Sequence, residues 1–280
     1  MSDKCEKVRI GSFQGFIKEN DFDANRKKVL EVIEQTKNDG LDFLCFPETY
    51  LSGILLESVR NSAVTIDDLR IVHLVESTKD YDTVYLVGMS EKRADGTYNV
   101  QLVFYKGEIL GRSTKTMLTP PEFECFITDL EMPVYEVKGI KFGIAICHTT
   151  SFIEPSLYLR YNGARLLFTP HYNSVRPSAF CFHRRMVLNN NLGIASLLKM
   201  VVVRSNVIVI DPDEVGCGDS NIWDMDGNLI ARGDQFKEMV VTAELDKKMF
   251  LEDHWIDQRE ISIGLLDKLY ESGKVFLQGS

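Results

Sequence analysis

The sequence predicts an α/β protein built from mixed β-sheets covered by helices. Strand-like and helix-like segments alternate up to residue 81, strands joined by tight turns follow from residue 83, and no Gly-, Pro- or Ser-rich linker interrupts the chain. Helix-connected strands pair in parallel and hairpins pair antiparallel, so both kinds of pairing are expected. We therefore expect one domain over residues 1–280, with the last ~30 residues as a C-terminal extension used in oligomer contacts.

The first part of the chain reads as two strand–helix units. The first predicted helix has Asp23 as its N-cap, an apolar face that includes Val29 and Ile33, and a C-terminal stop at Gly40. The strands before and after it are the apolar runs "VRIGSF" and "LDFLCFPE". In order, these elements and the second helix cover residues 8–13, 23–40, 41–48 and 67–81.

The middle of the chain changes to hairpins. Turn pairs separate consecutive strand-like segments at Asp95-Gly96, Lys106-Gly107, Lys138-Gly139 and Asp226-Gly227. Two further helices are expected at about 152–162 and 178–198. The predicted strands cover 83–92, 98–106, 108–115, 133–137, 140–147, 165–170, 201–210, the hairpin 220–233, and 239–245.

Composition limits the partners and the compartment. The chain has a formal net charge of −9 and a pI near 5.2, so a nucleic-acid partner or an anionic membrane surface is not expected. Its six cysteines are scattered without a C-x-x-C pair, as in reduced thiols of a cytoplasmic protein. No signal peptide and no run of ~20 apolar residues is recognised. Small molecules and proteins remain as expected partners.

Cys147 is the first candidate for chemistry, because it ends the predicted strand in "FGIAICHTTSFIEP". Sites in α/β sheets lie beyond the carboxyl ends of strands, although an arbitrary cysteine is more often a buried structural thiol. Its neighbour His148 is an obvious base, but consecutive strand residues point to opposite faces. We expect the His148 backbone N–H to support an oxyanion beside the sulfur, and its ring to line the pocket.

Two charged residues complete the candidate chemistry. Glu48 ends the predicted strand 41–48, where loss of solvent favours its protonated form and makes the carboxylate a better base. Lys115 directly follows a hairpin strand, and an ammonium near Cys147 would favour the thiolate and a negative tetrahedral adduct. A lone glutamate or lysine at such a place is usually solvated. A catalytic site is therefore predicted only from the three residues together.

Three segments in this order resemble the motifs of the nitrilase (carbon–nitrogen hydrolase) superfamily, whose members use a Glu–Lys–Cys triad. They are "FPETYLSG", "STKTMLTPPE" and "FGIAICHTTSFIEP". The resemblance implies a four-layer αββα sandwich of two mixed β-sheets covered by helices, paired into homodimers or larger assemblies. The matching positions are Pro47-Glu48, Lys115 with Leu118, Cys147 with Phe152 and Glu154, and more weakly Gln14, Asp21, Asn25 and the late hairpin.

The resemblance also implies an activity. Glu48 would take the thiol proton, Cys147 would attack an amide carbon, and Lys115 would hold the oxyanion. The product would be an acid plus ammonia or an amine, formed through a thioester from a small linear amide or carbamoyl amine. Glu122 sits where the family carries a second glutamate that holds the lysine, and no metal or organic cofactor is required.

Other residues are expected around the pocket, and their roles stay open. The segment "TPHYNSVRPS" follows the next strand, so His171, Tyr172 and Asn173 are expected near the substrate. Arg176 could pair with a substrate carboxylate, although a solvated loop arginine is the more common outcome. A metal site made of His171, Cys181 and His183 is disfavoured, because the spacing fits no standard zinc pattern.

The residues after Cys147 depart from the family's usual forms. The amidase branches commonly carry tyrosine-aspartate there and the nitrilase branches tryptophan-glutamate, whereas this chain has His148 and Thr149. The sequence therefore leaves two alternatives open beside amide hydrolysis. One is a nitrilase that converts a nitrile to an acid and ammonia. The other is a non-catalytic member that binds a ligand or a protein, although it retains all three triad residues.

Overall fold

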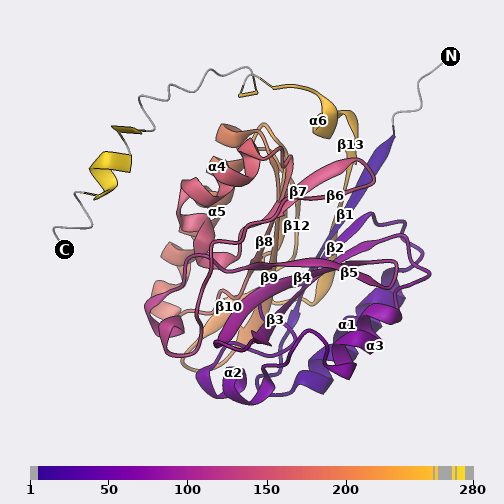
Figure 1. Cartoon of the computed structure of the whole chain (residues 1–280), viewed down its shortest axis with the longest axis vertical. Coiled ribbons are helices and arrows are strands. Elements are labelled where there is room, and N and C mark those ends of the chain that lie inside the picture. The colour runs from indigo at the N-terminus through magenta and orange to yellow at the C-terminus, as the bar shows by residue number, and fades with distance from the viewer. Residues whose placement is uncertain (1–5, 255, 258–266, 269, 275–280) are drawn as a thin grey trace.

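The chain folds into helices packed on the outer faces of β-sheets (Figure 1). The computed structural model describes residues 6–254, 256–257, 267–268 and 270–274. Its helices are α1 (Phe22–Thr36), α2 (Leu56–Ser62), α3 (Leu69–Glu76), α4 (Ile153–Tyr161), α5 (Phe180–Leu198) and α6 (Lys248–Leu251), with short 3₁₀ turns η1 (Pro120–Glu124), η2 (Cys147–Ser151) and η3 (Pro177–Ala179).

The strands form two mixed sheets. The first has the order β5-β4-β3-β2-β1-β13 and the second the order β6-β7-β8-β9-β11-β12. They join where the ends of β1 and β9 pair in parallel, with Gly15 opposite Val207, and β10 adds to β9. The bounds are β1 (Lys7–Phe16), β2 (Phe43–Cys45), β3 (Val84–Lys92), β4 (Thr97–Tyr105), β5 (Glu108–Thr114), β6 (Tyr135–Val137), β7 (Ile140–Ile144), β8 (Leu166–His171), β9 (Val201–Ile210), β10 (Val215–Cys217), β11 (Asn221–Trp223), β12 (Leu229–Arg232) and β13 (Met239–Asp246).

The inner faces of the two sheets bury a shared apolar core. Phe43 of the first sheet packs on Phe142 and Phe168 of the second, with ring centroids 5.3 and 5.8 Å apart. All three side chains are fully buried. Burial of a large apolar side chain stabilises the fold by about 1.5–3 kcal/mol, so these contacts hold the sheets face to face.

The outer faces are covered by two pairs of helices. Residues of α1 and α3, such as Val29 and Ile71, pack on the outer face of the first sheet. Residues of α4 and α5, such as Leu159 and Ile194, pack on that of the second. Figure 1 shows these helix pairs on opposite sides of the sheets. The predicted four-layer αββα sandwich is confirmed.

Helix α1 begins earlier than predicted. The side chain of Asp21 accepts a hydrogen bond from the Ala24 amide at 3.0 Å and caps the helix, whereas Asp23 lies in its first turn. Both aspartates suit a cap, and the outcome is decided by Phe22, which is buried against the core and starts the helix. The helix also ends at Thr36, before Gly40.

The strands carrying the predicted site end earlier than the sequence indicates. β2 ends at Cys45 and β7 at Ile144, each three residues before Glu48 and Cys147. The prediction that these two residues end strands is therefore wrong, because the apolar runs continue into buried turns that look like strand in the sequence. Cys147 opens η2 with a φ of +47°, a backbone conformation that side chains disfavour.

Gly88 of β3 allows the turn that carries Glu48 to lie directly against the sheet. Its carbonyl accepts a hydrogen bond from the Leu51 amide at 3.0 Å. A β-carbon at Gly88 would lie 2.4 Å from the Pro47 carbonyl oxygen and 2.4 Å from the Thr49 nitrogen. Both are backbone atoms, which cannot rotate away, so the position excludes any side chain.

The predicted C-terminal extension beyond residue 250 lies largely outside the described residues. Of its described part, Ile256 packs in the apolar cluster of α4 and α5, and Asp257 pairs with Arg160. Just before it, α6 packs through Phe250 into the core between the sheets. None of the helices in the described part of the chain combines the length and apolar character needed to cross a membrane.

Gly88→Ala should displace the Glu48 turn. We expect the free energy of unfolding to fall by about 1–3 kcal/mol, as for overpacked interior sites, and this is measured by urea denaturation. Gly193→Ala is the matched control, because nothing lies within 4 Å of its added β-carbon and alanine is favoured in helix α5. Equal stability of the two variants would contradict the close approach at Gly88.

Candidate active site

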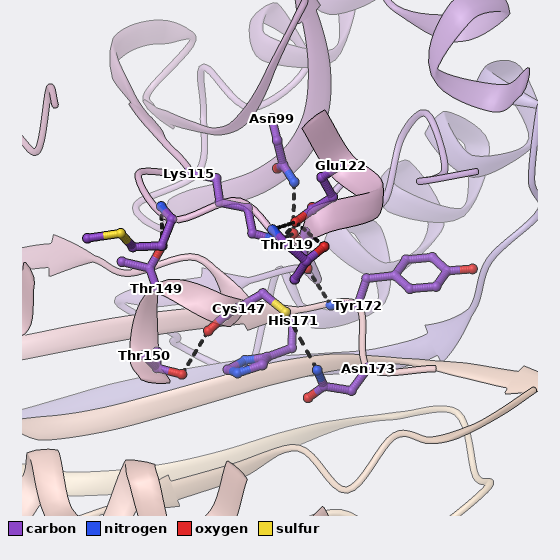
Figure 2. A network of polar contacts seen from close by, with 12 residues as sticks. Asn99, Lys115, Thr119, Glu122, Cys147, Thr149, Thr150, His171, Tyr172 and Asn173 are labelled. Atoms are coloured by element: carbon purple, nitrogen blue, oxygen red, sulfur yellow. Dashed lines mark hydrogen bonds and ion pairs between the residues drawn. The ribbon is translucent and has the colours of Figure 1, made fainter. Parts of the chain in front are cut away.

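A cavity of about 440 Å³ opens where several strands end. Its lining includes Glu48 after β2, Lys115 after β5, Cys147 after β7, and His171 at the end of β8. The three residues predicted to act together are therefore brought to one place, although they are up to 99 residues apart in the sequence. Figure 2 shows Lys115 and Cys147 with their neighbours.

The Glu48 carboxylate is fully buried and accepts three hydrogen bonds. Its Oε1 accepts from Lys115 Nζ at 2.7 Å and from Asn99 Nδ2 at 2.8 Å. Its Oε2 accepts from the backbone amide of Tyr172 at 2.7 Å. Donors from β4 and from the residues directly after β5 and β8 thus fix the carboxylate in one orientation and compensate its loss of solvent.

Lys115 is a buried ammonium held between two carboxylates. Only 1% of the side chain is exposed, and Nζ donates to Glu48 at 2.7 Å and to Glu122 at 2.6 Å. Burial alone would lower the pKa of Lys115, but Glu48, Cys147 and Glu122 together raise it above the ordinary lysine value. The side chain is therefore a permanent cation, and the prediction that Glu122 holds the lysine agrees with this geometry.

Glu122 is itself fixed by a capping box at the start of η1. Its Oε2 accepts from the Thr119 amide at 2.7 Å and from the Thr119 hydroxyl at 2.8 Å, while its Oε1 binds the lysine. A side chain that caps a turn with one oxygen has little freedom in the other. The η1 turn therefore positions Lys115.

Cys147 lies partly exposed at the wall of the cavity. The Thr150 hydroxyl donates to its carbonyl at 2.8 Å and secures the η2 turn. Burial raises the pKa of the Cys147 thiol well above its ordinary value, the charge of Glu48 raises it further, and Lys115 offsets only part of this. At neutral pH the resting group is a thiol, which needs a base before it can attack.

His148 follows Cys147 in the η2 turn. Its ring lines the cavity and packs edge-to-face on Phe152, with centroids 5.3 Å apart. Burial and then the charge of Lys115 lower its pKa, so the ring is neutral at pH 7. The backbone donor role predicted for His148 remains a prediction.

Tyr172 contacts the Glu48 carboxylate through its backbone. Its backbone amide binds Glu48, while its hydroxyl donates to Glu19 at 2.8 Å, and Figure 2 shows the ring directed away from Cys147.

Two side chains of this network had no signal in the sequence pattern: Asn99, which binds Glu48, and Arg204, which reaches the segment after β8. Both lie in the interiors of strands, where the sequence pattern does not indicate that a polar residue belongs to a site.

The remaining candidates do not join the network. Arg176 is exposed and does not line the cavity, so it is not placed to bind a substrate carboxylate there. His171 and His183 line the cavity, but Cys181 is exposed. Within the described ranges, no group of three or more His, Cys, Asp or Glu side chains is arranged to hold a metal ion.

The sequence profile of the carbon-nitrogen hydrolases matches residues 9–251. The chain belongs to the carbon–nitrogen hydrolase family. This confirms the predicted superfamily. The motifs around Glu48, Lys115 and Cys147 all lie within the matched range.

Similar proteins have several different names. The chain is 26% identical to a glutamine-dependent NAD(+) synthetase of Thermotoga maritima over 85% of its own length, but it spans only 42% of that relative. It is 24% identical to a formamidase of Pseudomonas syringae pv. tomato, over 89% of this chain and 72% of the relative. The family is thus shared, while the names of the relatives differ.

Solved structures share the fold. Saccharomyces cerevisiae Nit3, a member of the nitrilase superfamily, matches with a TM-score of 0.77 at 18% identity, covering 88% of this chain and 92% of that chain. The glutamine-dependent NAD+ synthetase of Acinetobacter baumannii matches with a TM-score of 0.76 at 22% identity, covering 88% of this chain and 47% of that one.

Lys115→Met should destabilise the protein strongly. The change leaves two buried carboxylates without their cation, for which we expect a loss of about 3–5 kcal/mol in the free energy of unfolding, measured by urea denaturation. Lys92→Met is the control, because Lys92 is exposed and no ion pair of its side chain is found among the described residues; about 0.5 kcal/mol or less is expected there. Similar losses in both variants would contradict the buried ion cluster.

Proposed function

We propose that this protein is a cysteine hydrolase that cleaves a small linear amide or carbamoyl amine to an acid plus ammonia or an amine. The observation that carries the proposal is the buried ion cluster of Glu48 and Lys115 beside a cavity-facing Cys147. Such a cluster contains a base, a cation and a nucleophile within one cavity, which are the groups that acyl transfer to sulfur requires.

The first half of the reaction forms a thioester. Glu48 accepts the thiol proton as the Cys147 sulfur bonds to the amide carbon, and the carbonyl electrons move onto oxygen. Because the thiol pKa is raised, the sulfur needs Glu48 to accept its proton as it attacks. Glu48 then returns the proton to the nitrogen, the C–N bond breaks, and ammonia or an amine leaves.

The second half hydrolyses the thioester. A water that loses a proton to Glu48 attacks the thioester carbon, the C–S bond breaks, and the proton restores the Cys147 thiol. In both halves the permanent charge of Lys115, with the backbone N–H of His148, stabilises the tetrahedral oxyanion. No step uses a metal or an organic cofactor.

The charges of the cavity wall favour an uncharged or cationic substrate. Among the described lining residues, Lys115 is the lone lysine or arginine, whereas the acidic residues are Glu48, Glu122, Glu124 and Glu214. A substrate carboxylate would meet this negative field without an arginine to bind it. The names of relatives, a formamidase and an (R)-stereoselective amidase of Pseudomonas species, support an amide substrate.

Nitrile hydrolysis is the second candidate, supported by 21% identity to an aliphatic nitrilase of Rhodococcus rhodochrous over 78% of this chain. The same thiol would attack the nitrile carbon. A non-catalytic binding protein is the third, but retention of Glu48, Lys115 and Cys147 argues against it.

We place the protein in the cytoplasm as a homodimer or larger homo-oligomer. The cysteines that the structure describes are all free thiols, which fits a reducing compartment. The assembly is proposed from the resemblance to the family.

Cys147→Ala should abolish turnover while leaving the fold intact. The assay is ammonia release from a panel of carboxamides, carbamoyl amines and nitriles, each in neutral, cationic and anionic forms. We expect the wild-type protein to prefer neutral or cationic amides and, after rapid quenching, to show an acyl adduct on Cys147 by intact mass. Activity preserved in Cys147→Ala would exclude the mechanism, and a wild-type protein without adduct or turnover would favour the binding protein.

Glu48→Gln should distinguish the role of Glu48 as a base from its effect on the pKa of the Cys147 thiol. The variant loses the proton acceptor, so we expect turnover to fall at least ~1,000-fold, within the range that general base catalysis contributes. It also loses the carboxylate charge that raises the thiol pKa, so iodoacetamide should alkylate Cys147 faster at pH 8 than in wild type.

Peptide mass spectrometry follows the alkylation, with the exposed Cys181 as an internal standard. Glu108→Gln, an exposed acidic residue that does not line the cavity, is the control. Slower alkylation of Cys147 in Glu48→Gln would refute this electrostatic account.

A further inference from the structure

The side-chain amide of Asn173 connects the candidate nucleophile to a buried arginine. Its Nδ2 donates to Cys147 Sγ at 3.5 Å, drawn as a dashed line in Figure 2. Its Oδ1 accepts from Arg204 Nη2 at 2.8 Å. Arg204 lies in β9 and is 4% exposed, and neither residue belongs to the three family motifs.

The chemistry of the arginine fixes which way this amide faces. A guanidinium can only donate hydrogen bonds, so the atom of Asn173 that meets it must be the oxygen. The NH₂ group therefore faces Cys147 Sγ. Without Arg204, the amide could rotate by half a turn and present its oxygen to the thiol, which would then act as the donor.

Arg204 and the Asn173 backbone are both held from β9 and the segment after β10. Arg204 Nη1 donates to the carbonyl oxygens of Gly218 at 3.1 Å and Asp219 at 2.7 Å. The backbone N–H of Asn173 donates to Asn206 Oδ1 at 2.8 Å. These contacts hold the Asn173 side chain beside the Cys147 sulfur.

We propose that Asn173 is a further catalytic residue, which stabilises negative charge on the Cys147 sulfur, and that Arg204 is the residue that positions it. The inference rests on the proposed function. As Glu48 takes the thiol proton, the weak hydrogen bond from Nδ2 becomes a bond to a thiolate, which is the stronger kind. The same donor stabilises the sulfur again when the C–S bond of the thioester breaks.

The test compares Asn173→Ala and Asn173→Asp with wild type. Loss of a hydrogen bond to a charged group predicts a kcat about 10- to 100-fold lower, with KM within about threefold, because the donor acts on the sulfur as it becomes charged. Iodoacetamide alkylation of Cys147 at pH 8, which needs no substrate, should slow in the order wild type, Asn173→Ala, Asn173→Asp. Asn189→Asp, an exposed position on α5, is the control and should match wild type.

Arg204→Lys and the double variant with Asn173→Ala test the positioning role. Lysine retains the charge but not the guanidinium fork, so we expect slower alkylation and lower kcat. In the Asn173→Ala background the same change should add less than about threefold, because the arginine acts through the amide. If the effects of Arg204→Lys and Asn173→Ala multiply in the double variant, the positioning role of Arg204 is overturned.

Wild-type alkylation rate and kcat in Asn173→Ala would overturn the catalytic role, even if the arginine variants fail to fold. The alkylation readout stays informative if no amide or nitrile is turned over. It therefore distinguishes failure of this inference from failure of the proposed function.

Discussion

The buried ammonium of Lys115 is the interaction on which the rest of the site depends. Two carboxylates, Glu48 and Glu122, lie within 2.7 Å of it, and all three side chains are almost completely removed from solvent. Ions are costly to bury unless each finds partners in good geometry. The donors from Asn99, Thr119 and the Tyr172 backbone are therefore conditions for the cluster to exist.

The apolar core of the sandwich stabilises the fold and positions this polar cluster. The aromatic and aliphatic core between the two sheets provides the stability, and it fixes the strand ends from which the polar residues project. Gly88 illustrates the coupling, since the absence of a side chain in the middle of β3 lets the Glu48 turn pack on the sheet.

The electrostatics of the cavity favour the protonated form of the Cys147 thiol. Burial and the neighbouring carboxylate outweigh the ammonium, which raises the pKa of the Cys147 thiol. Electrophiles and oxidants react with the thiolate, so a raised pKa slows their reaction with Cys147. The neutral His148 ring adds no charge to this balance and forms part of the wall instead.

The sequence by itself determined the class of fold and the hairpin turns, and it predicted three residues that the fold brings to one cavity. Alternating apolar periodicity and turn pairs are local signals, and Glu48, Lys115 and Cys147 stand in recognisable motifs. Only the tertiary structure decided that β2 and β7 end before the site. It also decided that Asn99 and Arg204 reach it from strand interiors, because such contacts join residues 51 and 31 positions apart. Their side-chain directions depend on how the sheets pair, and no local pattern records that.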